Sequence, residues 1–396
     1  MKVFGLGCAG RISRESILDM LTFGPEITKV TIADYNEAAA KEVVAWLDDD
    51  RVDAVKVDVT DTDATAKLME GYDIVVDGTQ ISLNDLSAAA ICKAGLPGIN
   101  LNGMSNEWDL DDQFKSLGKT MVPGFGMTPG ITNMMAMHMA NMLDTVESVR
   151  CSHGAFRPIA FSASIAETTR VEYDPDLPSR VVFEDGEFKQ VKPFARPMDI
   201  ALPEPYGTLP EYIIPHPEPL TLSKTLADKG VRLVEARGTW PAKNMRLISA
   251  MHEWGILRNP VVNVNGTDVG VLDAIFAHCL GSEEGTTTDL YGYALHVEVI
   301  GTKDGKRERH VMTHTHPASD GSVEDWAGLR AYTRNVGIPM GIGALMMLRG
   351  QANGTGTVAP ELAFDTQAVF DEMEKREMLV QHVVTEPDDV LETVNG

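Results

Sequence analysis

The sequence of 396 residues has few cysteines, few basic residues and no long hydrophobic run, and each shortage excludes a class of protein. Its four cysteines are scattered and form no C-x-x-C pair, so neither a disulfide framework nor a zinc site is indicated. The formal net charge of −24 argues against nucleic-acid and membrane partners, because such binding needs clustered lysine and arginine. No apolar run approaches the roughly 20 residues of a membrane-spanning helix.

The remaining composition, with 43% hydrophobic and 6% aromatic residues, is typical of a globular protein. The chain is longer than one ordinary hydrophobic core accommodates, so two domains are expected. The first predicted strand begins at Lys2, which leaves no room for a signal peptide, and we therefore expect a cytoplasmic protein.

A glycine-rich turn lies near the start of the chain, where Gly5, Gly7 and Gly10 form the pattern G-x-G-x-x-G between a predicted strand and a predicted helix. In dinucleotide-binding proteins this turn holds the pyrophosphate at the N-terminus of the helix. We expect Gly5 to permit the tight turn, Gly7 to let the backbone approach the phosphates, and Gly10 to allow close packing of helix on strand. Arg11 and Ile12, at the start of the predicted helix, are expected to contact the dinucleotide as well.

An acidic residue, Asp34, ends the next predicted strand some two dozen residues after Gly10. In this position a carboxylate accepts the hydroxyls of the adenosine ribose and repels a 2′-phosphate, so the sequence favours NAD over NADP. A later strand ends in Gly78-Thr79-Gln80, and ligands bind beyond the carboxyl ends of strands in such sheets. The other predicted cofactor contacts are Asp58, Val59 and Gly103.

The first 125 residues alternate strands and helices, which predicts a doubly wound parallel sheet. The predicted strands are 2–4, 29–33, 54–57, 74–77, 98–100 and 120–122, and the predicted helices are 11–21, 37–47, 63–69 and 83–93. From about 146 to 316 the pattern changes to short β-type runs at 148–151, 180–183, 231–235, 295–300 and 309–314. This part predicts a substrate domain on a mixed or antiparallel sheet, and helices follow at 326–336, 342–349 and 366–374.

Several segments together resemble the saccharopine dehydrogenase superfamily: the glycine turn, 126–133, 235–241, and 333–350 followed by 360–361 and 364–365. The similarity covers nearly the whole chain in order, and among the members the length and the short hinge are most similar to lysine 6-dehydrogenase. The resemblance implies an α/β protein with an N-terminal Rossmann domain at 1–125 and a central mixed-sheet substrate domain at 126–320 that carries the contacts of a homodimer. It further implies that C-terminal helices at 321–396 pack back on the nucleotide domain.

The resemblance also implies an activity, the NAD-dependent oxidation of a C–N bond in an amino acid or the reduction of the matching imine. One segment departs from the pattern: relatives of lysine 6-dehydrogenase read L-R-Y-P-G-H where this chain reads Gly238-Thr-Trp-Pro-Ala-Lys243. Thr239 replaces the arginine of that pattern, and the nearest arginine is Arg237. The replacement indicates either a displaced cation or a different substrate.

Oxidation of an amine requires a base near neutral pH, and histidine is the usual one. His153 follows a predicted strand, and His216 lies in a loop fixed by prolines with Tyr212 nearby. His252 lies in a helical stretch, where a packed or surface residue is the favoured interpretation.

The substrate carboxylate requires an anchor, for which a planar guanidinium is well suited. Arg157, Arg170 and Arg237 are available, and Arg237 is preferred because it neighbours the family motif. Glu167 is a candidate partner for a substrate ammonium, although a solvated helix face explains it equally well.

A metal site is considered at His310, His314 and His316, which on a strand would share one face. No acidic or cysteine pattern completes the site, so a polar edge strand is favoured and no metal is expected.

Two alternative functions remain open. The first is the reverse chemistry, a reductive condensation of an amine with a keto acid or aldehyde, as in relatives that form saccharopine or carboxynorspermidine. The second is a dinucleotide-sensing protein without turnover. The candidate bases and the long, loop-rich central domain favour catalysis.

Overall fold

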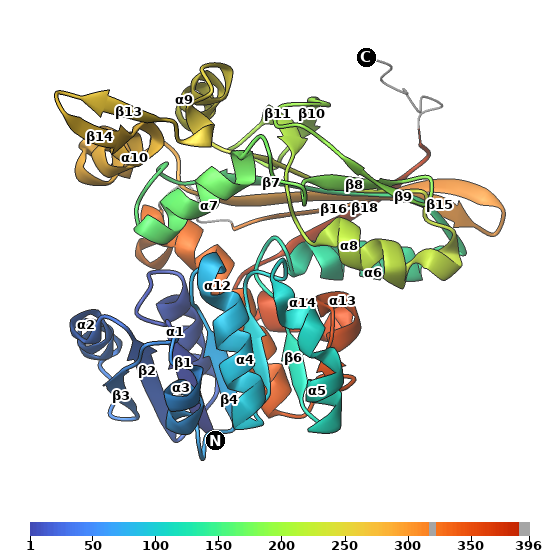
Figure 1. The fold of residues 1–396 in the computed structure, drawn as a ribbon. Coiled ribbons are helices and arrows are strands. Elements are labelled where there is room, and N and C mark those ends of the chain that lie inside the picture. Colours follow the sequence, from blue (N-terminus) through green and yellow to red (C-terminus); the bar gives the residue numbers. More distant parts are fainter. Residues whose placement is uncertain (317–321, 388–396) are drawn as a thin grey trace. The chain divides into compact units, whose positions relative to one another are not determined.

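The computed structural model describes residues 1–316 and 322–387 (Figure 1). The chain divides into two compact units. The first comprises Met1–His138 and Thr333–Glu377, and the second comprises Met139–Tyr332 and the residues from Met378 onward. No helix in the described part of the chain combines the length and hydrophobicity that a membrane crossing requires.

The first unit is built on a parallel sheet of seven strands in the order β17-β6-β5-β4-β1-β2-β3. The strands are β1 (Lys2–Leu6), β2 (Lys29–Asp34), β3 (Val52–Lys56), β4 (Ile74–Asp77), β5 (Gly98–Asn100), β6 (Thr120–Val122) and β17 (Gly356–Thr357). The central strands are nearly continuous runs of buried apolar residues, because helices cover both faces of such a sheet. The order of the strands reverses at β1, so the predicted doubly wound sheet is confirmed.

Polar side chains cap the first turn of α2 and α3 in this unit. Asn36 accepts a hydrogen bond from the Ala39 N–H at the start of α2, and Asp61 accepts one from Ala64 at the start of α3. The helices up to the hinge are α1 (Ser13–Phe23), α2 (Glu37–Leu47), α3 (Thr62–Leu68), α4 (Asn84–Ala94), α5 (Asp111–Ser116) and α6 (Ile131–Asn141), of which α6 runs into the second unit. The first helix begins at Ser13, two residues later than the sequence predicted.

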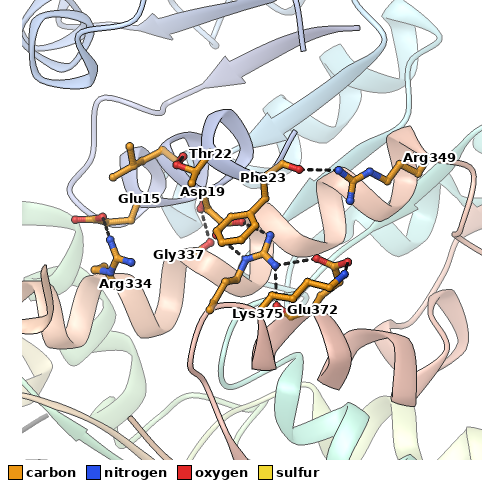
Figure 2. Close-up of polar contacts among 12 residues, drawn as sticks. Glu15, Asp19, Thr22, Phe23, Arg334, Gly337, Arg349, Glu372 and Lys375 are labelled. Carbon is orange, nitrogen blue, oxygen red and sulfur yellow. Dashed lines mark hydrogen bonds and ion pairs between the residues drawn. The ribbon is translucent and has the colours of Figure 1, made fainter. Parts of the chain in front are cut away.

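Helices from the far end of the chain complete the first unit (Figure 2). They are α12 (Leu329–Leu348), α13 (Pro360–Ala363) and α14 (Thr366–Glu374). Gly337 of α12 lies against α1, since an added Cβ would be 2.5 Å from the Ile12 carbonyl oxygen, and the Ser16 hydroxyl donates to its carbonyl at 2.6 Å. The predicted return of the C-terminal helices to the nucleotide-binding fold is thus confirmed.

A buried ion pair joins α1 to the end of α14. The Arg376 guanidinium donates to both carboxylate oxygens of Asp19 at 2.6 and 2.9 Å and to Glu372 at 2.8 Å. Asp19 and Arg376 are each about 5% exposed. A second, peripheral pair joins Arg349 to Glu26 at 2.8 Å. Figure 2 shows the other contact of Arg349, its hydrogen bond to the Phe23 carbonyl.

The second unit is built on a mixed sheet in the order β10-β11-β12-β7-β15-β16-β18, with β8 and β9 attached through β12. The central strand β7 (Thr145–Phe156) runs parallel to β12 and antiparallel to β15, so the predicted mixed sheet is confirmed. The other strands are β8 (Val181–Glu184), β9 (Glu187–Gln190), β10 (Met198–Ala201), β11 (Thr208–Ile213), β12 (Leu233–Thr239), β15 (Gly292–Lys303), β16 (Lys306–Thr315) and β18 (Val380–Thr385).

The helices of the second unit are α7 (Ala163–Tyr173), α8 (Glu218–Thr225), α9 (Ala242–Glu253), α10 (Val271–Gly281) and α11 (Glu283–Thr286), and a separate hairpin consists of β13 (Val261–Val264) and β14 (Thr267–Gly270). The last strand, β18, pairs with β16 and thus belongs to this unit. The sequence predicts helices throughout this end of the chain, and for Val380–Thr385 that prediction is wrong. Its three valines and its threonine are β-branched residues that favour a strand instead.

Candidate functional site

The glycine turn and the loop after β4 pack on each other with no room for side chains. Gly7 has a φ of +67°, and an added Cβ would lie 2.7 Å from the Thr79 nitrogen and 2.9 Å from the Gly78 carbonyl carbon. A Cβ on Gly78 would in turn overlap the hydroxyl of Ser13, at the start of α1. The two loops therefore form a bare backbone cradle before a helix N-terminus, which fits the pyrophosphate of a dinucleotide.

The roles predicted for the other two glycines are wrong. Gly5 lies inside β1 rather than in the turn, and an added Cβ would be 3.1 Å from Cys8 and 3.4 Å from Ile17 of α1. Around Gly10 the nearest atoms lie 3.8 Å away, which leaves room for a side chain. A side chain at position 5 would thus press first on Cys8, and the turn depends on Gly7.

Asp34 ends β2 at the same edge of the sheet as the glycine turn. Its Oδ1 accepts the Asn36 N–H at 3.0 Å, and Lys56 is its register partner on β3. Arg11 is exposed after the glycine turn, and Ile12 beside it is half-buried. The carboxylate of Asp34 is thus placed to accept further hydrogen bonds from a ribose.

The other residues that are predicted to contact the cofactor differ in the interactions that they already make within the protein. Asp58 accepts the N–H and the hydroxyl of Thr60, and Val59 is buried in the hydrophobic core. Gln80 is exposed, and the Gly103 carbonyl accepts the Trp108 indole N–H at 3.0 Å. The Asp58 and Val59 side chains and the Gly103 carbonyl are therefore already engaged in local structure.

A buried carboxylate that the sequence did not single out organises the loop after β4. Asp77 accepts the Thr79 hydroxyl at 2.7 Å, the Thr79 N–H at 3.0 Å and the Ser87 hydroxyl at 2.5 Å. Burial raises the pKa of Asp77, although these donors act in the opposite direction. The loop that faces the glycine turn is thereby fixed by hydrogen bonds to one side chain.

In the second unit, His153 lies at the centre of an aromatic cluster. Its ring stacks on Tyr293 of β15 at 5.4 Å between centroids, and it meets the edge of Trp240 at 5.8 Å and the ring of His216 at 5.7 Å. A Cβ on Gly238 would lie only 2.8 Å from His153 Cε1, so this glycine makes room for the imidazole. The structure thus brings together two of the three predicted bases.

Several polar atoms around this cluster are buried and have no hydrogen-bond partner among the described residues. They are His153 Nδ1, Arg157 Nε, Glu172 Oε2 and Trp240 Nε1. Arg157, His153 and Trp240 are each only 2% exposed. Because buried polar atoms in native proteins are rarely left unpaired, such a set marks a place where a ligand or water completes the hydrogen bonding.

Arg157 and Glu172 bring opposite charges to this cluster. Arg157 bonds the Pro158 carbonyl at 3.1 Å and the Thr169 hydroxyl at 3.2 Å, and its guanidinium carbon lies 5.8 Å from the centre of the Tyr332 ring. Burial raises the pKa of Glu172, while the charge of Arg157 opposes that shift. A cation and a carboxylate buried beside two imidazoles match the two charges of an amino acid.

The two histidines differ in their affinity for protons. Burial, together with the neighbouring charges of His216 and Arg157, holds the pKa of His153 well below its ordinary value. Burial also acts to lower the pKa of His216, but the carboxylates of Glu218 and Glu172 outweigh it and leave that pKa raised. Glu218 Oε2 lies 3.4 Å from His216 Nδ1.

Arg237, the preferred anchor from sequence, is engaged elsewhere. It donates to both oxygens of Glu235 at 2.7 and 3.2 Å and to the Arg196 carbonyl at 2.6 Å. It pairs with Ser152 across the strands, so its side chain points to the opposite face of the sheet from that of the adjacent His153. The arginine that lies with the histidines is Arg157.

The other predicted residues lie around or away from the cluster. Tyr212 packs its ring against Phe194 at 5.2 Å, and His252 contacts the same ring at 5.3 Å. Glu167 is half-buried on α7, the helix that also carries Glu172, and Arg170 is exposed. Sequence reasoning missed Glu172, Trp240 and Glu218, and only the short spacing of Glu218 from His216 offered a signal.

The three histidines weighed as a metal site do not converge. His310 lies between Glu308 at 2.9 Å and His382 at 3.1 Å, whereas His314 pairs with the Leu379 carbonyl at 2.8 Å. His316 stacks on the indole of Trp326. Within residues 1–316 and 322–387 no group of three or more His, Cys, Asp or Glu side chains is arranged to hold a metal ion.

The first sheet and its glycine cradle define a Rossmann-type nucleotide-binding protein with a second unit on a mixed sheet. Comparison with protein families agrees: residues 3–122 match the saccharopine dehydrogenase NADP binding domain, and residues 126–379 match the saccharopine dehydrogenase C-terminal domain. The chain therefore belongs to the saccharopine dehydrogenase family of NAD(P)-dependent oxidoreductases, and the resemblance seen in the sequence is confirmed.

Individual relatives are distant. A carboxyaminopropylagmatine dehydrogenase from a Synechocystis strain is 22% identical over 362 residues, covering 84% of this chain and 85% of the relative. Among solved structures, apo saccharopine dehydrogenase (L-Glu forming) from Saccharomyces cerevisiae matches with a TM-score of 0.74 at 16% identity, covering 97% of this chain and 99% of that one. Homospermidine synthase from Legionella pneumophila, solved with NAD, matches with a TM-score of 0.61 at 14% identity, covering 99% and 92%. The two structural matches support the fold.

Proposed function

We propose that the protein is an NAD-dependent dehydrogenase that oxidises a C–N bond of an amino acid, as lysine 6-dehydrogenase does. The observation that carries this proposal is the buried set of unpaired polar atoms from His153, Arg157, Glu172 and Trp240. A zwitterionic substrate would pair its carboxylate with Arg157 and its ammonium with Glu172. The histidines would then exchange protons with the reacting nitrogen.

The overall reaction balances with one oxidant and one water. An ammonium R–CH₂–NH₃⁺, NAD⁺ and water yield R–CHO, NH₄⁺, NADH and a proton. When bound, the nucleotide supplies the hydride acceptor. The protein has to bind and orient the amine and to move protons to and from its nitrogen.

A second candidate is reductive condensation of an amine with a keto acid or aldehyde. The name of the curated relative favours it, since carboxyaminopropylagmatine combines an amine with a carboxyl-bearing amino group. The same cluster serves this reaction, because formation and hydrolysis of an imine need the same proton transfers in opposite order.

Absorbance at 340 nm with the purified full-length protein separates these functions. We expect NADH to form when NAD⁺ is mixed with a dibasic amino acid such as L-lysine. Consumption of NADH only in the presence of an amine and a carbonyl compound together would replace the first proposal with the condensation. If a broad panel of amines gives no change in either direction while calorimetry shows tight NAD binding, the protein is a sensor and both catalytic proposals fail.

The preference for NAD is tested by the substitution Asp34→Ala. Removal of the carboxylate deletes the acceptor for the ribose hydroxyls and the charge that repels a 2′-phosphate. We expect NAD to bind about tenfold more weakly, a loss of roughly 1.4 kcal/mol, and discrimination against NADP to decrease. Calorimetric titration of both nucleotides measures this, with Glu187→Gln on the exposed hairpin as a control. Unchanged affinity for both nucleotides would remove Asp34 from the site.

A further inference from the structure

We propose that His153 is the general base of this site and His216 its general acid, and that Glu218 is the positioning residue that keeps the two imidazoles in different protonation states. The proposal rests on the proposed oxidation at a C–N bond and assigns the proton transfers within it. Neither the family nor the relatives' names assign these roles.

The surroundings of His153 favour a neutral imidazole. Tyr293 from β15 stacks on its ring, Trp240 after β12 meets it in a T-shaped contact, and the backbone of Gly238 lies against it. The charged groups directed toward it are both cationic, Arg157 from the end of β7 and His216 from the loop before α8. With Nδ1 buried and unpaired, this ring is placed to accept a proton.

The surroundings of His216 favour the imidazolium form. Glu218, in the first turn of α8, has its Oε2 at 3.4 Å from His216 Nδ1. The carboxylate of Glu172 on α7 adds a second negative charge, and the ring of His153 lies 5.7 Å away between centroids. Two titratable groups whose surroundings separate their proton affinities are the usual arrangement of an acid and a base.

The two roles match the steps of deamination. His153 takes a proton from the substrate ammonium, so that the neutral amine can lose hydride to the oxidant. Water then adds to the resulting iminium carbon and releases one proton to solvent. His216 donates its proton to the nitrogen of the carbinolamine, and the C–N bond breaks with its electron pair leaving on nitrogen. As the carbonyl forms, the hydroxyl proton passes to the departing ammonia, which leaves as ammonium. His153 then releases its proton to solvent and His216 regains one, which gives the overall equation.

The pH dependence of kcat/KM tests the assignment. A neutral base and a protonated acid give a bell-shaped profile, whose acidic limb reports His153 and whose alkaline limb reports His216. In Glu218→Gln the imidazolium loses its nearest counter-charge. We expect the alkaline limb to move to lower pH by about one unit, as removal of an opposite charge at this distance does. Glu187→Gln, a matched substitution on exposed β9, should leave both limbs in place.

A second readout does not depend on turnover. Histidine labelled with ¹³C at Cε1 gives a titration midpoint for each ring by NMR, with assignments from His153→Asn and His216→Asn. We expect the His216 midpoint to lie above that of His153 and to fall in Glu218→Gln. A reversed order of midpoints, or an unmoved limb together with an unmoved His216 midpoint, would overturn the proposal.

The failures of the two proposals are distinguishable. If wild-type protein turns over no amine, the proposed function fails, and with it the catalytic roles, whatever the NMR midpoints show. If wild-type turnover is present but neither the alkaline limb nor the His216 midpoint responds to Glu218→Gln, the function stands and the acid–base assignment is wrong.

Discussion

Arg376→Met is expected to lower the free energy of unfolding of the first unit by about 3–5 kcal/mol, the range found when one partner of a buried ion pair is removed. Asp19 would remain buried without the guanidinium that binds both of its oxygens. The Arg376 guanidinium also stacks on the Phe23 ring at 3.9 Å, and methionine retains most of the apolar stem, so the loss reports the charged group rather than a cavity.

Urea denaturation combined with hydrogen exchange of peptides from α1 measures this effect, because two units need not unfold in one transition. Arg349→Met is the matched control. Its partner Glu26 is 29% exposed, so the loss should stay within about 1 kcal/mol. If both variants lose a similar free energy of unfolding, the Asp19–Arg376 ion pair does not stabilise the packing of α14 on α1 more than an exposed pair would.

His153→Asn is expected to lower kcat/KM by about 10²–10⁴-fold, the usual contribution of a general base. The asparagine is close in size to the imidazole and can still form hydrogen bonds, so the fold should be retained. Affinity for NAD should change little, because the glycine cradle and Asp34 lie on β1, β2 and β4.

Steady-state kinetics and calorimetry on the same samples separate these effects. His278→Asn, an exposed histidine on α10, is the control and should behave as wild type. If His153→Asn retains wild-type kcat/KM, then His153 exchanges no proton in the rate-determining step. A loss confined to NAD affinity would place the histidine in nucleotide binding instead.

The strands of the first sheet could largely be predicted, because the residue patterns that define them are local in the sequence. The buried runs of β1, β2 and β4 are bounded by turn residues, and the glycine pattern directly follows the first strand. The roles within that pattern were less predictable, since the need for glycine at positions 5 and 7 depends on neighbours such as Ile17 and Thr79. The spacing of the glycines does not show which atoms a Cβ at each position would contact.

The helix α12 shows how packing overrides a local signal. The sequence predicts two helices separated near Pro339, yet one helix runs from Leu329 to Leu348. Proline removes one backbone donor, but the helix is held in place because Gly337 and Gly341 allow close approach to α1. That contact joins residues more than 300 positions apart, which no local pattern contains.

The candidate substrate cluster was predictable only in part. His153 and His216 were found as residue types, but Glu172, Trp240 and Tyr293 join them from α7, the end of β12 and β15. Arg237 was preferred for its place in the motif, but the strand register places its side chain with that of Glu235 on the opposite face of the sheet from His153. The alternation of side chains along a strand shows which residues share a face of the sheet. Which of the two faces meets a ligand depends on how the whole sheet is packed.

The measurement that tests the account most directly is the ¹³C NMR spectrum of Cε1-labelled histidine with NADH and the substrate amine present together, a complex that cannot react. We expect the chemical shifts of His153 and His216 to change, while those of His310 and His382, on β16 and β18, stay the same. Unmoved resonances of His153 and His216 at saturating amine would contradict it, because the substrate would then bind outside this cluster.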